Sequence, residues 1–202
     1  MSASAARYPI LADTSALVAT ANTSQWEAVR DTLQLTTTNV CVQELRRHER
    51  ENHEYAREGS REYQLNRGSR RAIAAIEDPE TPWSSITCVP RPHGADAGEE
   101  SLQREVVQHP DVYEVVAVMD DGARKSIRRA LDRREQSVQV VAPTYLFYLL
   151  QDSGVIDRER FCTVCGEMLE NEGWTGYKAV KIAWEQIPVN CDDVLEDDLL
   201  PP

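Results

Sequence analysis

The stretch EVVAVMDDGARKSIRRALDRREQSVQVVAPTYLFYLLQDSGVI, residues 114–156, decides the fold of this chain. It predicts, in order, a buried strand over 114–119, a basic helix over 122–134, a second strand over 138–142 and an apolar helix over 143–154. A proline in the first turn and a glycine after the last turn favour these bounds of the apolar helix. Strands that alternate with helices in this way predict a parallel sheet covered by helices on both faces.

The rest of the chain continues this alternation. We expect strands over 8–13, 33–37 and 85–89, and helices over 14–21, 40–76, 98–109, 157–171 and 176–187. The sequence TTN before the 40–76 stretch offers an N-cap, and Gly59 and Gly68 are expected to interrupt that helix. These elements predict an α/β fold in one domain over 1–188, with a polar helical arm at about 50–82 and an acidic tail over 189–202.

The composition is typical of a soluble protein with a sizeable core. The chain has 202 residues, 41% of them hydrophobic, and its N-terminus lacks the apolar stretch of a secretory signal. No run approaches the ~18 apolar residues of a membrane span. We therefore expect a cytoplasmic protein with no membrane partner and with reduced cysteines. Cys162 and Cys165 form a lone CxxC, which we interpret as reduced core cysteines rather than half of a zinc site.

The charge of the chain is acidic overall but uneven. The formal net charge is −12, and only three of the 22 cations are lysines. This bias indicates a salty cytoplasm, where salt screens self-repulsion; an acidic protein from a GC-rich genome is the alternative. Residues 122–134 nevertheless carry six cations and one acid, whereas 185–202 carry six acids and no cation. The overall acidity therefore does not exclude a nucleic-acid partner at the basic helix.

Carboxylates gather at the predicted carboxyl edge of the sheet. Asp13 follows the first strand, and Asp120 and Asp121 follow the strand that opens the quoted stretch. Glu44 and Glu99 lie in the first turns of two helices near the same edge. Ligands of parallel α/β sheets bind at this edge, and carboxylates brought together repel one another unless a cation neutralises them. Oxygen ligands of this kind suit Mg²⁺ or Mn²⁺, which can activate water for phosphodiester hydrolysis.

The motifs ADTSAL, VQEL and GEESL, followed by the quoted stretch, resemble those of PIN-domain ribonucleases over about residues 8–170, here with an acidic, haloarchaeal-like composition. The resemblance implies a PIN-like three-layer α/β/α sandwich with a mainly parallel central sheet. It also implies a metal-dependent endoribonuclease that uses Mg²⁺ or Mn²⁺ and forms a homodimer. The acids that it implies as catalytic and metal-binding, with Ser15 or Thr14 as a polar neighbour, are Asp13, Glu44, Glu99, Asp120 and Asp121.

The third of these acids is the weakest match to the family pattern. The segment GADAGEES offers Asp96, Glu99 and Glu100. We choose Glu99 because it follows Gly98 and precedes Leu102 at helical spacing.

Each acid also has a structural interpretation. Asp13 and the pair Asp120–Asp121 each precede a helix, where aspartate commonly serves as an N-cap. Glu44 lies beside a buried helix face, but surface glutamates are common on helices. The arm has its own alternatives, because i,i+3 pairs within 50–71 indicate a solvated helix, whereas guiding RNA or forming a dimer would be functional roles.

Substrate binding is expected from Ser15 and from cations that follow the acidic pair. These cations are Arg124, Lys125, Arg128 and Arg129. They could contact RNA phosphate, which would make binding salt-dependent. Alternatively, Arg124 and Arg128 share one helix face and only balance nearby acids.

These observations favour a ribonuclease in which an ion-activated water, held by the carboxylate cluster, attacks the phosphodiester bond. A toxin-type enzyme with a small antitoxin-like partner and an RNA-processing enzyme are both compatible with the sequence. The alternatives from other classes are a non-catalytic RNA-binding or scaffold module and a structure-specific DNA nuclease.

Overall fold

The structure is a computed structural model of the chain, and it describes residues 9–51, 57–83, 86–92, 96–171 and 191. The helix expected over 176–187 and, apart from Cys191, the acidic tail lie outside the described residues. The described part confirms the α/β fold class with a parallel central sheet.

Four short parallel strands form the central sheet. They are β1 (Ile10–Ala12), β2 (Leu35–Thr36), β3 (Val115–Ala117) and β4 (Gln139–Val141), in the spatial order β2-β1-β3-β4. The register pairs Leu11 with Thr36 on one side and with Val116 on the other. Since all four strands point the same way, their carboxyl ends meet at one edge.

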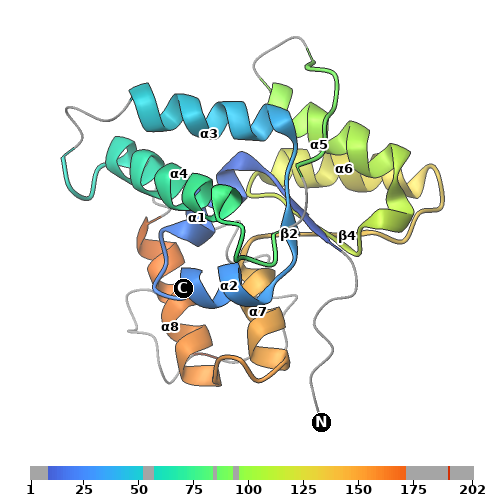
Figure 1. Ribbon diagram of the computed structural model, residues 1–202. Coiled ribbons are helices and arrows are strands. Elements are labelled where there is room, and N and C mark those ends of the chain that lie inside the picture. The colour runs from blue at the N-terminus through green and yellow to red at the C-terminus, as the bar shows by residue number, and fades with distance from the viewer. Residues whose placement is uncertain (1–8, 52–56, 84–85, 93–95, 172–190, 192–202) are drawn as a thin grey trace.

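Eight α-helices surround this sheet in the described part of the chain (Figure 1). They are α1 (Thr14–Ala21), α2 (Trp26–Thr32), α3 (Asn39–Glu51), α4 (Arg61–Glu77), α5 (Ala97–Gln108), α6 (Asp121–Asp132), α7 (Thr144–Asp152) and α8 (Arg158–Asn171). A short 3-10 helix over Pro110–Val112 precedes β3. The sequence pattern does not indicate α2. The predicted strand over 85–89 is wrong for its described residues, 86–89, because Thr87 makes only an isolated bridge to Thr38. Residue 85 lies outside the described residues.

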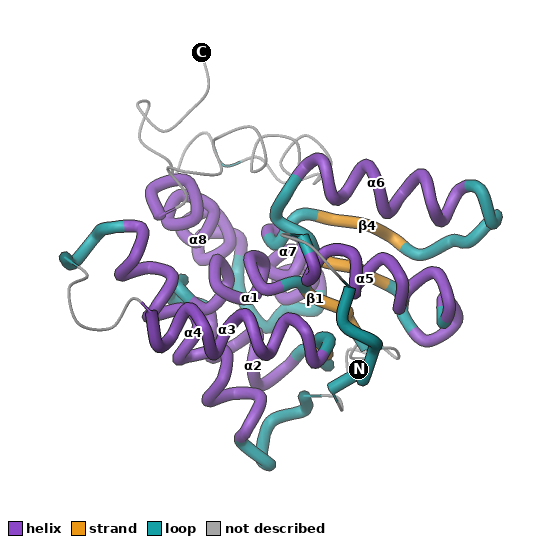
Figure 2. The backbone as a smooth tube through the Cα atoms, turned by 90° about the horizontal axis from the view of Figure 1, so that it is seen from above, coloured by secondary structure: helices purple, strands orange, loops and turns teal. Residues whose placement is uncertain are grey.

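The strands separate two hydrophobic cores, which makes the fold a three-layer sandwich. Ile10 and Ala12 of β1 point to a core built with α1, α2, α4, α7 and α8. Leu11, between them, points to a second core built with α5 and α6. This alternation follows from the two-residue period of a strand. Figure 1 shows α5 and α6 on one side of the strands and α7 and α8 on the other, and Figure 2 shows how short the strands are beside the helices.

The packing of α4 changes the interpretation of the segment at about 50–82, which was expected to be a solvated polar arm. The helix begins at the N-cap Ser60, directly after Gly59, whose φ is +80°, so the predicted interruption there is confirmed. The predicted interruption at Gly68 is wrong. Gly68 lies inside α4, where an added Cβ would meet the Val18 carbonyl oxygen of α1 at 2.6 Å. One face of α4 is therefore buried against α1 rather than solvated along its whole length.

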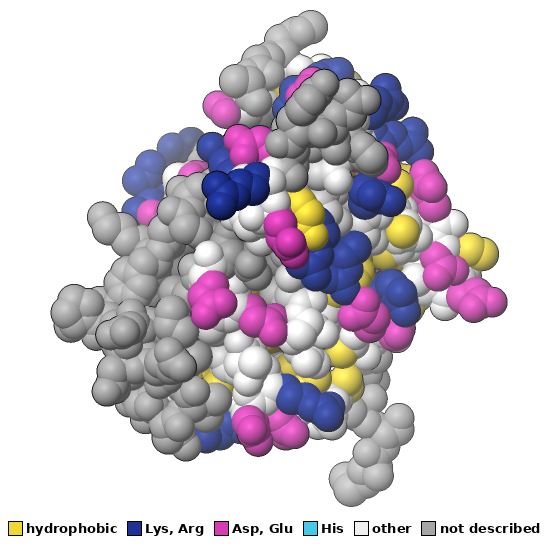
Figure 3. All heavy atoms as spheres, turned by 90° about the vertical axis from the view of Figure 1, so that its left-hand side faces the viewer, with side chains coloured by type: hydrophobic (Ala, Val, Ile, Leu, Met, Phe, Trp, Pro, Cys, Tyr) yellow, Lys and Arg dark blue, Asp and Glu magenta, His cyan; other side chains and the backbone are white. Residues whose placement is uncertain are grey.

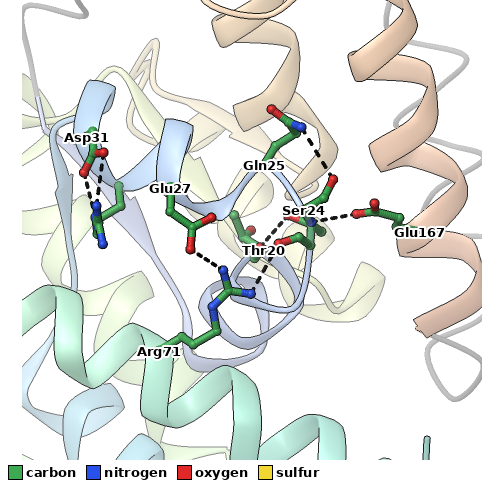
Figure 4. Close-up of polar contacts among 9 residues, drawn as sticks. Thr20, Ser24, Gln25, Glu27, Asp31, Arg71 and Glu167 are labelled. Carbon is green, nitrogen blue, oxygen red and sulfur yellow. Dashed lines mark hydrogen bonds and ion pairs between the residues drawn. The ribbon is translucent and has the colours of Figure 1, made fainter.

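Polar contacts also hold α4 and α8 to the loop between α1 and α2 (Figure 4). Arg71 of α4 donates to the Thr23 carbonyl oxygen at 3.3 Å and pairs with Glu27 at 2.6 Å. The Ser24 backbone N–H donates to the Glu167 carboxylate of α8 at 2.7 Å. These contacts fix the C-terminal end of α1, while its N-terminal end lies at the carboxyl edge of the sheet.

The expectation of reduced cysteines is wrong for one pair. Cys162 of α8 forms a disulfide with Cys191, their Cα atoms being 5.4 Å apart. Cys165 is a buried free thiol, as expected of a core cysteine. The sequence did not indicate the pairing, because the two cysteines are 29 residues apart and only tertiary packing brings them together.

No helix among the described residues is long and apolar enough to cross a membrane.

Candidate functional site

Asp13 lies where β1 ends and α1 begins. Its carboxylate accepts a hydrogen bond from the Ala16 backbone N–H at 2.5 Å, so it is the N-cap of α1. The structural interpretation of Asp13 is therefore correct, and it does not exclude a site role, since a carboxylate has a second oxygen. The residue is 4% exposed. Burial thus holds a carboxylate at the carboxyl edge of the sheet in one orientation.

Glu44 is fixed by two neighbouring segments. The Thr14 hydroxyl donates to its Oε2 at 2.6 Å, and the Gly98 backbone N–H donates to its Oε1 at 3.1 Å. A Cβ added at Gly98 would lie 2.5 Å from Glu44 Oε2. Only glycine allows the α5 backbone to approach the carboxylate this closely. The first turns of α1 and α5 therefore orient the side chain that α3 supplies.

The third acid is decided by the direction of the side chains at the start of α5. Glu99 and Asp96 line the same polar cavity as Asp13 and Glu44. Glu100 instead pairs with Arg104 at 2.9 Å and lines a groove between α5 and α6. The geometry thus supports Glu99, adds Asp96 beside it and leaves Glu100 outside the site.

The polar cavity at the carboxyl edge has a volume of about 160 Å³. It is lined by Asp13, Thr14, Ser15, Glu44, Arg47, Asp96, Gly98 and Glu99. The groove between α5 and α6 is larger, about 420 Å³, but none of its lining residues is among the predicted site residues. The smaller cavity is the one that matches the predicted chemistry, because four acids and two hydroxyl residues line it.

The two aspartates after β3 differ in their surroundings. Asp120 is the N-cap of α6, accepting a hydrogen bond from the Ala123 backbone N–H at 2.7 Å, and its charge contributes to the raised pKa of Glu99. Asp121 pairs with Lys125 and Arg124, and these cations, Lys125 first, lower its pKa. Asp120 thus lies near the acids of the cavity, whereas Asp121 is neutralised by its own helix.

The crowding of acids changes their protonation. The pKa of Asp13 is raised to about 7, first by burial and then by the charges of Glu99 and Glu44, against the lowering effect of backbone hydrogen bonds from Ala16 and Met119. Burial also raises the pKa of Glu99 to about 6, together with the charges of Asp120, Asp96 and Glu44. Such shifts occur where carboxylates share a site without a compensating cation.

The donor chemistry of the cavity fits a hard divalent cation, but its side chains do not yet form a complete ligand set. Carboxylates at the start of α1, on α3 and at the start of α5 line one cavity, and carboxylate oxygens are the ligands that Mg²⁺ and Mn²⁺ prefer. Within the described residues, no group of three or more His, Cys, Asp or Glu side chains is arranged to hold one ion.

The cations predicted to bind substrate have different environments. Arg124 is 1% exposed and donates to the Val118 and Met119 carbonyl oxygens at 2.8 and 2.6 Å. It is therefore a structural residue, and the prediction that it contacts substrate is wrong. Arg128 is half-buried and donates to the Val140 carbonyl oxygen, so it too bonds the end of a strand. Lys125, which pairs with Asp121, and Arg129 are exposed on α6.

The sequence did not indicate Arg47 or the role of Gly98, whereas Asp96 was among the candidates for the third acid. Arg47 lies three residues after Glu44 on α3, so both residues share one helix face. That spacing could have indicated that Arg47 lies beside the site. The role of Gly98 could not be read from the sequence, because it depends on an approach between α5 and α3.

The parallel α/β/α sandwich, with acids at the carboxyl edge of its sheet, has the architecture of a PIN-type nuclease fold. The chain matches the family model described as "Halobacterial PIN domain" over residues 1–201, and it belongs to this family. PIN domains are generally nucleases that use divalent metals. Searches of curated proteins and of solved structures found no significant match.

Proposed function

We propose that this protein is a metal-dependent endoribonuclease that hydrolyses RNA phosphodiester bonds at the carboxylate cavity. The observation that carries the proposal is the cavity at the carboxyl edge of the sheet, where the buried Asp13 lies together with Glu44 and Glu99. A protein does not gain stability from ionised carboxylates in such a place, so their presence there suggests a cation-binding role.

Four acids would hold Mg²⁺ or Mn²⁺: Asp13, Glu44, Glu99 and Asp120. When bound, such an ion supplies activation of water and stabilisation of the charge that develops on the phosphoryl group. Asp121 would act only indirectly, because it is engaged by Lys125. Ser15 lines the cavity and would donate its hydroxyl to substrate.

The residues around the acids orient them before substrate arrives. The Ala16 N–H fixes one oxygen of Asp13, and Thr14 and Gly98 fix both oxygens of Glu44. Glu99 is only half-buried at the cavity, and its raised pKa would let it hold a proton in mildly acidic solution. Preorganised acids of this kind lose little conformational entropy on binding an ion.

The direct test compares Asp13→Asn and Asp120→Asn with Glu100→Gln as a matched control. Glu100 is the neighbour of Glu99, but it pairs with Arg104 outside the cavity. Each purified variant is incubated with RNA and DNA of the same sequence, with Mg²⁺, Mn²⁺ or EDTA, at low and high KCl. We expect cleavage of RNA that needs metal, is lost in both aspartate variants and is kept in the control. Full activity of the aspartate variants would place the site elsewhere.

The second candidate function is a non-catalytic RNA-binding module with the same fold. The specific observation in its favour is that the described acids do not form a complete three-ligand group. Calorimetry with Mn²⁺ separates the two functions. Binding at or below millimolar metal supports the enzyme, and no binding in that range supports the module. Cleavage of DNA rather than RNA in the substrate panel would support a DNA nuclease.

The cellular role that we propose is that of a cytoplasmic homodimer acting either as a toxin neutralised by a small antitoxin-like protein or in RNA processing. An adjacent short reading frame encoding a small DNA-binding protein would support the toxin role. Co-expression of the two proteins should then abolish RNA cleavage, whereas an RNA-processing enzyme would keep its activity.

A further inference from the structure

Two consecutive arginines of α3 have different neighbours. Arg46 pairs with Glu77 of α4 at 3.2 Å. Arg47 instead lines the carboxylate cavity together with Glu44. Their side chains are 50% and 55% exposed, so they differ in direction and not in burial. Successive residues of an α-helix are about 100° apart around its axis, which is why adjacent arginines reach separate surfaces.

Arg47 is the one cation among the described residues that line this cavity. Its ion pair is with Glu51 at 3.8 Å, and both side chains of this pair are more than half exposed. An exposed pair at this distance contributes little stability. The described ion pairs do not join Arg47 to Glu44, Glu99 or Asp13. Arg47 therefore lines the acidic cavity, and the described ion pairs leave its guanidinium unpaired with the acids of that cavity.

A guanidinium in this position fits a phosphodiester. Its fork of N–H groups can donate two parallel hydrogen bonds to the non-bridging oxygens of one phosphate. The substrate phosphate must approach several carboxylates, which repel it, and a cation at the rim offsets part of that repulsion.

The distribution of surface charge adds to this argument. On the face of the molecule that lies at the left of Figure 1, basic and acidic side chains are interspersed and do not form one continuous basic field (Figure 3). At 1 M salt the Debye length is about 3 Å, so long-range attraction contributes little. Hydrogen bonds from a guanidinium to a phosphate are weakened less by high salt, because they act at contact distance.

We propose that Arg47 binds a backbone phosphate of the nucleic acid at the mouth of the carboxylate cavity. This inference rests on the proposed function, since it assigns the substrate-binding cation of the same site. It replaces the buried Arg124 in that role with a residue of α3.

The experiment compares Arg47→Gln and Arg47→Lys with the control Arg46→Gln. Binding of a fluorescein-labelled single-stranded RNA, and of DNA of the same sequence, is measured by anisotropy in EDTA over a range of KCl. Neither cleavage nor bound metal enters this readout. All three variants should unfold at the temperature of the wild type, because both positions are exposed.

We expect Arg47→Gln to weaken RNA binding roughly tenfold, the effect of losing a charged hydrogen bond. The slope of log K against log salt should fall by about 0.7, as for one lost phosphate contact on a single strand. Arg47→Lys should be intermediate, since it keeps the charge without the fork. Arg46→Gln should bind as the wild type does. Equal loss with DNA would show that the contact is to phosphate alone.

Two results would overturn the assignment. In the first, Arg47→Gln binds RNA with wild-type affinity and an unchanged salt slope. In the second, RNA binding is unchanged but Mn²⁺ binds more tightly to Arg47→Gln, which would make Arg47 a neutraliser of the acids. A wild type that binds RNA through Arg47 but never cleaves it would refute the nuclease proposal and keep this one. A wild type that binds no RNA in EDTA would refute this assignment, and only a wild type that also fails to cleave RNA with metal would refute both.

Discussion

Asp13→Asn should stabilise the metal-free protein above neutral pH. The pKa of Asp13 is raised from 3.8 to about 7, mainly by burial, so the folded protein holds a proton that the unfolded chain has already lost. Between these values the unfolding free energy of the wild type falls as pH rises. The whole difference corresponds to about 4 kcal/mol, at 1.36 kcal/mol per pKa unit.

Asparagine cannot ionise but is still a good N-cap, so the substitution isolates the charge. Between pH 5 and pH 8 the stability advantage of Asp13→Asn over the wild type should grow by about 3 kcal/mol. Added Mn²⁺ should offset the difference by stabilising only the wild type, by about 2.7 kcal/mol at a concentration of 100 Kd.

The assay is urea unfolding at fixed KCl, at pH 5 and pH 8, with EDTA or with Mn²⁺. Comparing variant with wild type removes the contribution of other titrating groups to a first approximation. The reasoning is refuted if Asp13→Asn and wild type differ by the same free energy at both pH values in EDTA. A response of the variant to Mn²⁺ as large as that of the wild type would refute the role of Asp13 as a metal ligand.

Three further predictions test other contacts of the structure. Gly98→Ala should abolish most of the RNA cleavage, because the new Cβ would lie 2.5 Å from the Glu44 carboxylate and displace it. The double variant Gly98→Ala with Glu44→Asp, whose acid is shorter, should recover part of that cleavage. Arg124→Gln should lower the unfolding free energy by about 2–4 kcal/mol, measured in urea, since it leaves buried carbonyl oxygens without donors. Reduction of the Cys162–Cys191 disulfide with dithiothreitol should lower the unfolding free energy by about 3–4 kcal/mol, the chain-entropy value for a sequence separation of 29. Dithiothreitol should not change the stability of Cys162→Ser, which already lacks this bond.

The local elements could be predicted because their causes are local. The apolar runs that end in Asp13 and Asp120 form β1 and β3, and both aspartates cap the helix that follows. Gly154, with a φ of +74°, follows the end of α7 as expected. Each of these features depends on residues within one or two turns, so composition and spacing are enough to indicate it.

Other features could not be predicted because they depend on contacts between distant segments. Arg124 has the sequence context of a substrate-binding cation, but the fold buries it against the carbonyl oxygens that follow β3. Gly68 has the sequence context of a helix interruption, but α1 packs closely against α4 at that point. The choice among Asp96, Glu99 and Glu100 likewise needed the direction of the first turn of α5.

The sequence by itself determined the class of fold, the order of its four paired strands along the chain, and which acids end at the carboxyl edge. Those properties follow from the period of hydrophobic residues and from parallel strand direction, which no later packing can reverse. Only the tertiary structure decided that Glu99 and Asp96 face one cavity, that Asp13 is buried enough to hold a proton near neutral pH, and that Arg47 rather than Arg124 is exposed beside the acids. Burial and direction are properties of neighbours brought from other parts of the chain, and a linear sequence does not contain them.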